Sequence, residues 1–343
     1  MAPDQPTIVE RVRSAGVGSW DAALVAALLI TITAAGASVA NFATGRNWGF
    51  LLLDLIPIAL IALPLTLVVI TGEIDLSVAS VLGLSSAVLG QLWSSGWPLP
   101  VAAVASVLLG AVLGAVNGTF VTVFGLPSLA VTIGTLALYR GLAFVVLGDR
   151  AVADFPFSWS ANAVRAIPGT HIPWFVLVVA GLAVVFGVVL HATPIGRGLY
   201  AAGNNAEAAR FSGISVNRMK FWLFVVTGAV SALAGVFWTF RYASARADNG
   251  SGLELSVVAA VLLGGVSIFG GRGTILGVLA GVLLLGSLRN ALQLADVSAD
   301  TLTVVTGALL IVSVVTPNAV QIARERLRRG RSPSSISSEI PSS

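Results

Sequence analysis

Two carboxylates stand two residues apart in the segment Thr71-Gly-Glu-Ile-Asp-Leu-Ser-Val-Ala-Ser80, which separates two long apolar runs. A charge at the edge of a membrane span is costly unless it is capped, hydrated or functional. Asp75 could serve as the N-cap of the following helix while Gly72 turns the chain. Alternatively, the segment interrupts a helix whose N-terminal backbone donors face a translocation path, where they could meet a hydroxyl-rich solute.

A second group of candidates consists of neutral polar residues inside apolar runs. We expect these residues, together with Asp75, to line a path that accepts hydroxyl groups; they are Ser77, Asn117, Thr132 and Asn290. Asn117 and Asn290 could instead join neighbouring helices by hydrogen bonds, which is the common role of such amides in a membrane. Arg140 and Arg289 lie close enough to the predicted outer ends to extend their charges toward the interface, and no chain of acids crosses the middle of a span.

The residue inventory excludes several kinds of site. The sequence has no cysteine and two histidines, so neither a thiolate site nor a histidine metal cluster is expected, and no cofactor is predicted. The glycine-rich segment from Leu263 to Thr274 lacks the G-x4-G-K-[ST] pattern, and the single lysine, Lys220, lies elsewhere. We therefore expect neither a catalytic centre nor a nucleotide-binding loop in this chain.

Composition indicates a polytopic membrane protein. Of 343 residues, 56% are hydrophobic and 10% are charged. The net charge of +4 arises from cations beside apolar runs, which indicates membrane topology rather than binding to nucleic acid. About ten runs reach the roughly 20 residues that a span requires. They lie near 20–40, 51–70, 76–96, 98–118, 126–148, 172–190, 219–241, 254–270, 273–293 and 300–317.

The distribution of cations predicts that both termini are cytoplasmic. Five arginines fall between residues 324 and 331, and residues 191–220 carry four cations and one acid. We therefore predict a cytoplasmic segment at 1–19, a transmembrane domain at 20–317 that contains the cytoplasmic loop 191–220, and a basic, disordered tail at 318–343. A retained first span is favoured over a signal peptide because the first apolar run is longer than the apolar core of a signal peptide. The external segments 149–171 and 243–253 are either a docking surface or solvated loops.

The loop 191–220 contains a predicted short helix. Asn204 is a candidate N-cap, Glu207 stands three residues later as in a capping box, and Gly213 suits the left-handed C′ position. Together with Asn204, Glu207 and Gly213, the residues Ala208, Ala209 and Arg210 are candidates for coupling to a partner protein. A capped, exposed helix suits a docking site for another protein, but an ordinary solvated connector would show the same features.

Glycine spacing and an internal similarity add two expectations about packing. The series Gly110, Gly114 and Gly118 and the pair Gly277 and Gly281 predict close helix contacts. Asp75-Leu-Ser-Val and Glu254-Leu-Ser-Val open two predicted spans that are five spans apart and therefore run in opposite directions. This pattern indicates an inverted repeat, as found in many transporters.

Three segments resemble the ribose-type (monosaccharide) permeases of ABC importers. The run from Gly198 to Lys220 contains Glu207-Ala-Ala-x3-Gly213, which is similar to the EAA-type loop, and the segments 71–78 and 263–274 resemble the family in the same order. The family usually has glycine where this chain has Glu73, so the chain departs from the family by an added charge beside Asp75.

This resemblance implies a permease subunit of the bacterial inner membrane, largely helical with about ten spans. It further implies a second permease subunit, cytoplasmic ATP-binding subunits that contact the EAA-type loop, and an extracytoplasmic binding protein that delivers a monosaccharide or a related small polyol-like solute. The alternative from the residues alone is an ion-coupled secondary carrier.

Overall fold

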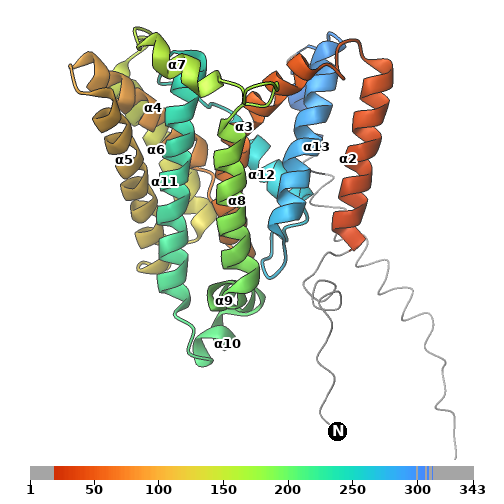
Figure 1. The fold of residues 1–343 in the computed structure, drawn as a ribbon. Helices are drawn as coiled ribbons and strands as arrows, with labels where there is room; N and C mark the ends of the chain where they lie inside the picture. The colour runs from red at the N-terminus through yellow and green to blue at the C-terminus, as the bar shows by residue number, and fades with distance from the viewer. Residues whose placement is uncertain (1–18, 299, 306, 309–310, 312–343) are drawn as a thin grey trace, which may run out of the picture.

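The computed structural model describes residues 19–298, 300–305, 307–308 and 311, and these form a bundle of helices (Figure 1). Residues 1–18 of the predicted segment 1–19, the predicted tail 318–343 and the end of the tenth predicted span, 312–317, lie outside the described residues. The helices are α2 (Ser19–Ser38), α3 (Gly45–Ile70), α4 (Val78–Ser94), α5 (Leu99–Thr122), α6 (Ser128–Leu147), α7 (Phe157–Val164), α8 (Phe175–Ala192), α9 (Pro194–Asn204), α10 (Ala206–Phe211), α11 (Val216–Tyr242), α12 (Leu253–Leu263) and α13 (Ile275–Leu294).

Seven of the described helices are long and apolar enough to cross a membrane, and α4 and α12 are shorter apolar helices. The seven are α2, α3, α5, α6, α8, α11 and α13. The all-helical, multi-span architecture is confirmed for the described residues, in which the only β structure is two isolated bridges. These nine helices lie at the first nine of the ten predicted spans.

Helix α3 forms the centre of the bundle, where it contacts α8, α11, α12 and α13 (Figure 1). It is almost entirely buried although it contains Pro57 and Pro64. Proline removes a backbone hydrogen bond, but in a membrane helix the neighbouring helices can satisfy the carbonyl group that loses its partner. Helices α2 and α8, by contrast, bury few of their residues within the bundle, as helices in contact with lipid do.

The predicted glycine contacts are confirmed at two helix pairs. A Cβ added to Gly114 would lie 2.2 Å from the carbonyl oxygen of Phe224, and one added to Gly228 would lie 2.2 Å from that of Gly110. Helices α5 and α11 therefore meet backbone to backbone. In the same way, a Cβ on Gly281 would lie 2.5 Å from the carbonyl oxygen of Ala260 in α12. Only glycine allows these approaches.

Two predicted spans have different limits in the structure. Helix α12 ends at Leu263 rather than near residue 270, because Gly265, Gly270 and Gly271 adopt positive φ values that a continuing helix does not allow. Helix α4 begins at Val78, so Asp75 lies outside it. Local backbone geometry therefore makes these two helices shorter than their apolar sequences predict.

The segment between α11 and α12 was predicted as an external loop, yet every second residue of its first half is buried. Ala245 and Ala247 are buried, whereas Arg246 and Asp248 are exposed. A Cβ on Gly90 would lie 2.6 Å from the Cβ of Ala245, and one on Gly83 would lie 2.8 Å from the carbonyl oxygen of Asn249. Seven residues of α4 separate these glycines, about 10 Å along a helix axis. The segment thus packs along α4 rather than being merely a solvated loop.

The expectation that Arg140 extends toward the interface is wrong. Its guanidinium group is partly buried and donates to the carbonyl oxygens of Ala247 at 2.7 Å, Asn249 at 2.8 Å and Ala79 at 3.2 Å. Backbone carbonyl groups of two other segments therefore hold the charge, which is one of the usual partners for an arginine inside a membrane protein. Arg289 is exposed.

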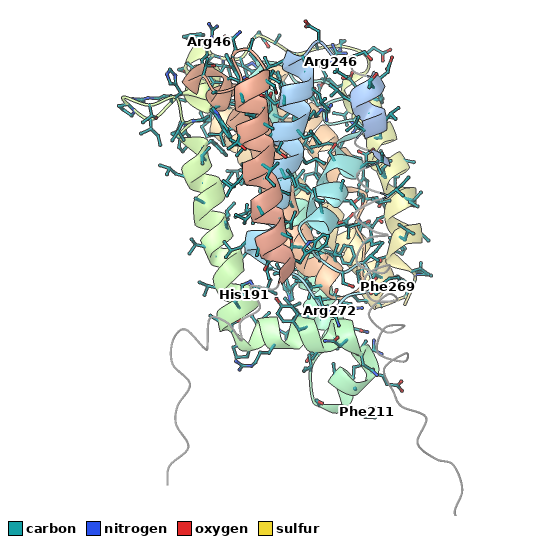
Figure 2. All side chains as sticks on the ribbon, turned by 90° about the vertical axis from the view of Figure 1, so that its right-hand side faces the viewer. Arg46, His191, Phe211, Arg246, Phe269 and Arg272 are labelled. Carbon is teal, nitrogen blue, oxygen red and sulfur yellow. The ribbon has the colours of Figure 1, made fainter. Side chains whose placement is uncertain are left out.

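The bundle has two distinct ends. Arg46 and Arg246 lie at one end, whereas His191, Arg272 and Phe211 lie at the other, which we call the α10 end (Figure 2). The segment 149–171, predicted to be external, includes α7, which the sequence did not predict. A two-way backbone pairing between Val152 and Ala245, at 3.0 and 2.8 Å, joins this segment to the chain that follows α11.

Candidate functional site

The loop 191–220 folds into two helices rather than one. Helix α9 begins at Pro194, and Thr193 caps it by accepting a hydrogen bond from the backbone N–H of Gly196 at 3.5 Å. Asn205, with extended backbone angles, then separates α9 from α10. Figure 1 shows α10 projecting beyond the bundle, joined to it through α9 and the start of α11.

The predicted N-cap of α10 is wrong by one residue. Asn205, not Asn204, caps the helix, and its Oδ1 accepts from the backbone N–H groups of Glu207 at 3.0 Å and Ala208 at 2.9 Å. Asn204 is the last residue of α9, and its side chain donates to the carbonyl oxygen of Tyr200 at 2.8 Å. With Asn205 as the cap, Glu207 is at the second helical position, so the predicted capping-box spacing is absent. Two adjacent asparagines made the assignment ambiguous.

The C-terminal cap of α10 is confirmed. Gly213 has φ +83°, and its N–H donates to the carbonyl oxygen of Arg210 at 2.9 Å while the N–H of Ile214 donates to that of Ala209 at 3.1 Å. These two bonds form a Schellman motif, in which glycine at C′ avoids the steric cost of the left-handed conformation. The motif fixes the direction in which the chain returns toward α11.

Helix α10 exposes most of its surface. Glu207, Ala208 and Arg210 are exposed, whereas Ala209 is buried against Ala202 and Val216. Phe211 is 87% exposed and lies at the tip of the α10 end (Figure 2). The sequence interpretation missed Phe211; an aromatic residue directly before the cap of a polar, alanine-rich helix was the available signal. An exposed aromatic side chain on a rigid support is typical of a protein contact.

Helix α9 contacts two non-helical segments of the bundle, one directly after α3 and one between α12 and α13. The Tyr200 hydroxyl donates to the carbonyl oxygen of Gly273 at 2.7 Å, between α12 and α13. A Cβ on Gly203 would lie 1.9 Å from the carbonyl oxygen of Ile70, where α3 ends, and that oxygen accepts from Gly271 at 2.8 Å. Burial, and to a smaller extent the carboxylate of Asp21, raises the pKa of Tyr200 to about 12, so its hydroxyl remains a donor at neutral pH.

A chain of polar contacts also joins α10 to the main bundle. Arg210 donates from Nη2 to Oδ1 of Asn217 in α11 at 2.9 Å, and Asn217 donates from Nδ2 to the carbonyl oxygen of Thr122 at the end of α5 at 2.9 Å. A displacement of α10 would therefore act on α5, α9 and α11 together.

The interruption between α3 and α4 forms a second polar cluster. Asp75 is not the N-cap of α4; its Oδ1 accepts from the backbone N–H of Ser77 at 2.9 Å and from the Ser77 hydroxyl at 2.6 Å. Asn117 donates to Oγ of Ser77 at 2.8 Å, and Tyr139 donates to Oδ1 of Asn117 at 3.3 Å. These bonds hold the buried carboxylate and connect the start of α4 to α5 and α6.

The same segment is held from α6 by two hydroxyl groups. Ser128 accepts from the N–H of Ile74 at 3.1 Å, and Thr132 donates to the carbonyl oxygen of Ile74 at 3.2 Å. The structure thus brings together four of the five residues predicted for the path, and all four are at most 2% exposed. Sequence interpretation missed Ser128 and Tyr139 because only the fold brings them to this segment.

Asn290 lies apart from this cluster. Its side chain forms a reciprocal pair with Asn47, in which Asn47 donates at 2.8 Å and Asn290 donates at 3.2 Å. The pair joins α13 to the start of α3, which agrees with the interhelical role that was the alternative for this residue.

Comparison with known proteins identifies the family. A sequence profile described as "Branched-chain amino acid transport system / permease component" matches residues 47–314, which is most of the chain. The chain belongs to this family of permeases. No solved structure matches it significantly.

Curated relatives match nearly the whole length of the permease. The chain is 36% identical over 315 residues to the autoinducer 2 import system permease protein LsrD of Escherichia coli (strain K12), covering 90% of this chain and 94% of the relative. LsrD of Shigella flexneri is equally similar, and that of Escherichia coli O157:H7 is 35% identical. The chain is therefore a multi-pass permease subunit of a bacterial ABC importer in the inner membrane, as the sequence resemblance implied.

Proposed function

We propose that the permease carries a monosaccharide or a related small polyol-like solute, which an extracytoplasmic binding protein delivers and which ATP hydrolysis by separate cytoplasmic subunits drives inward. The relatives named for import of autoinducer 2 support a sugar-like solute. The main support for energy coupling comes from α10. This capped helix exposes Phe211, and α9 attaches it to the non-helical segments that follow α3 and α12.

In this proposal, the exposed residues of α10 form the contact with the ATP-binding subunit. Glu207, Ala208, Arg210 and Phe211 touch the partner, whereas Asn204, Asn205, Ala209 and Gly213 fix the position and shape of the helix. The division follows from the contacts within the chain. The side chains of Asn204 and Asn205 bond to Tyr200 and to the first turn of α10, Gly213 forms the C-terminal cap, and Ala209 is buried.

We further propose that the α10 end is cytoplasmic. Arg197, Arg210, Arg218, Lys220 and Arg272 belong to the loops at this end, and the positive-inside rule places such loops in the cytoplasm. Ten spans, cytoplasmic termini and an inverted repeat complete the proposed topology. A second permease subunit, identical or different, completes the membrane domain.

The polar cluster around Asp75 is proposed to lie along the path for solute. Asp75, Ser77, Asn117 and Thr132 hold the first turn of α4 in the described conformation, and their burial means that solute reaches them only when this turn moves. Asn290 is assigned to helix packing instead.

Single cysteines test the docking proposal cleanly because the chain has none of its own. We expect Ser212→Cys, beside Phe211, to cross-link to a co-expressed ATP-binding subunit, and the exposed Ser251→Cys at the opposite end not to do so. Labelling of intact cells with a membrane-impermeant maleimide should modify Ser251→Cys and spare Ser212→Cys. The opposite labelling pattern would reverse the proposed orientation.

Solute uptake tests the proposed substrate. Membrane vesicles containing the complete transporter should accumulate a labelled sugar or polyol supplied with its binding protein. Accumulation of leucine but of no sugar would contradict the proposed solute class, and uptake driven by a proton gradient alone would favour a secondary carrier.

A further inference from the structure

Glu73 and Lys220 form an ion pair although 147 residues separate them in the chain. The side chain of Glu73 is 16% exposed and that of Lys220 is 13% exposed, so both charges are mostly withdrawn from water. Such a pair is screened less by salt than a surface pair. Lys220 is the only lysine of the chain.

The glutamate end of the pair belongs to the interruption between α3 and α4. Gly72, with φ +80°, turns the chain directly before Glu73, and the next residue, Ile74, is held by Ser128 and Thr132 of α6. Ser77, four residues after Glu73, bonds to Asn117 and precedes α4. The Glu73 carboxylate is therefore attached to the segment that sets the position of the α4 start.

The lysine end belongs to the opening turns of α11, directly after α10. Met219, the residue before Lys220, packs with Ile214 in a small cluster built on Ala202, Ala209 and Val216, which come from α9, α10 and α11. This cluster makes α10 and the start of α11 one packed unit. A movement of α10 therefore displaces the Lys220 ammonium group as well.

We propose that Glu73 and Lys220 are positioning residues that transmit the displacement of α10 to the start of α4. This inference rests on the proposed docking of an ATP-binding subunit at α10. The pair connects the docking unit to the polar cluster around Asp75 through one charged contact, in addition to the contacts of α9. It also accounts for Glu73: beside Asp75 a second unpaired carboxylate would be unfavourable, and the ammonium group of Lys220 offsets its charge.

The test compares variants that change charge with variants that keep it. Lys220→Met removes the ammonium group at similar length, Lys220→Arg keeps a cation, Glu73→Gln keeps the shape of the side chain, and the double variant Glu73→Lys with Lys220→Glu reverses the pair. Each is reconstituted with the ATP-binding subunit and binding protein, and the measured quantity is solute transported per ATP hydrolysed.

We expect Lys220→Met and Glu73→Gln to lower this ratio by about tenfold, a size typical of coupling between sites. Association with the ATP-binding subunit should remain, and Lys220→Arg and the reversed pair should retain most of the ratio. A purely structural role would lower thermal stability and total activity without changing the ratio. Should a single variant fail to fold, the double variant Glu73→Gln with Lys220→Met removes both charges and leaves neither unpaired. The same loss of solute transported per ATP is expected for it.

A wild-type ratio in Lys220→Met and Glu73→Gln, with wild-type stability, would overturn the inference and leave the proposed function standing. Failure of the ATP-binding subunit to bind even the wild-type permease would instead overturn the proposed function.

Discussion

Replacing Phe211 by alanine should weaken binding of the ATP-binding subunit strongly without affecting the fold. The side chain is 87% exposed, so the permease alone loses little packing when it is removed. Its burial in a partner pocket would cover about 150 Å². At about 25 cal/mol per Å² this area corresponds to ~4 kcal/mol.

The measured effect should be smaller than this area product. Holding the ring in one rotamer consumes about 1 kcal/mol, and the Cβ atom of alanine retains part of the contact. We therefore expect a loss of about 2–3 kcal/mol, which corresponds to a dissociation constant ~30- to 150-fold higher. The assay is titration of the purified ATP-binding subunit against the permease in lipid nanodiscs.

The chain offers a matched control for this measurement. Phe157 in α7 is 85% exposed but lies at the opposite end of the bundle. Phe157→Ala should leave the dissociation constant within about twofold of wild type, since surface substitutions away from a contact change free energies by less than about 0.5 kcal/mol. Equal weakening by both variants, or unchanged binding by Phe211→Ala, would refute the assignment of α10 as the contact.

Three further predictions concern packing and the cap. Gly114→Val should separate α5 from α11 and lower the free energy of unfolding in detergent by about 1–3 kcal/mol, whereas Gly134→Ala, whose added Cβ meets nothing within 4 Å, should leave the melting temperature nearly unchanged. Gly213→Val places a β-branched residue at φ +83° and should abolish ATP-driven uptake while the protein still inserts and elutes as a single species. Asn117→Ala removes the donor to Ser77 and should lower the unfolding free energy by about 1 kcal/mol, measured by thermal denaturation.

Hydrophobic runs predicted the helical architecture well because a membrane requires long apolar segments whose backbone is satisfied internally. The glycine series of α5 could also be predicted, since its spacing alone places Gly110, Gly114 and Gly118 on one helix face. The limits of α4 and α12 could not, because they depend on hydrogen bonds and backbone angles that hydropathy does not report. The wrong cap at Asn204 has the same origin.

Contacts between distant segments were the least predictable part of the site. Asn117 and Ser77 were both selected as polar residues in apolar runs, but their mutual bond, and the contribution of Tyr139, follow from the packing of α4, α5 and α6. Arg140 was expected to reach the interface because its position in the run allowed it. Three backbone carbonyl groups brought in by the segment after α11 and by α4 hold it instead.

Uptake into proteoliposomes is the most direct test of the central claim that α10 couples ATP hydrolysis by a partner subunit to transport. Vesicles should contain ATP, the ATP-binding subunit and the permease, with solute and its binding protein added outside. We predict uptake that requires all of these components and is lost in the Phe211→Ala variant at limiting partner concentration. Undiminished uptake without ATP or without the ATP-binding subunit would contradict the account.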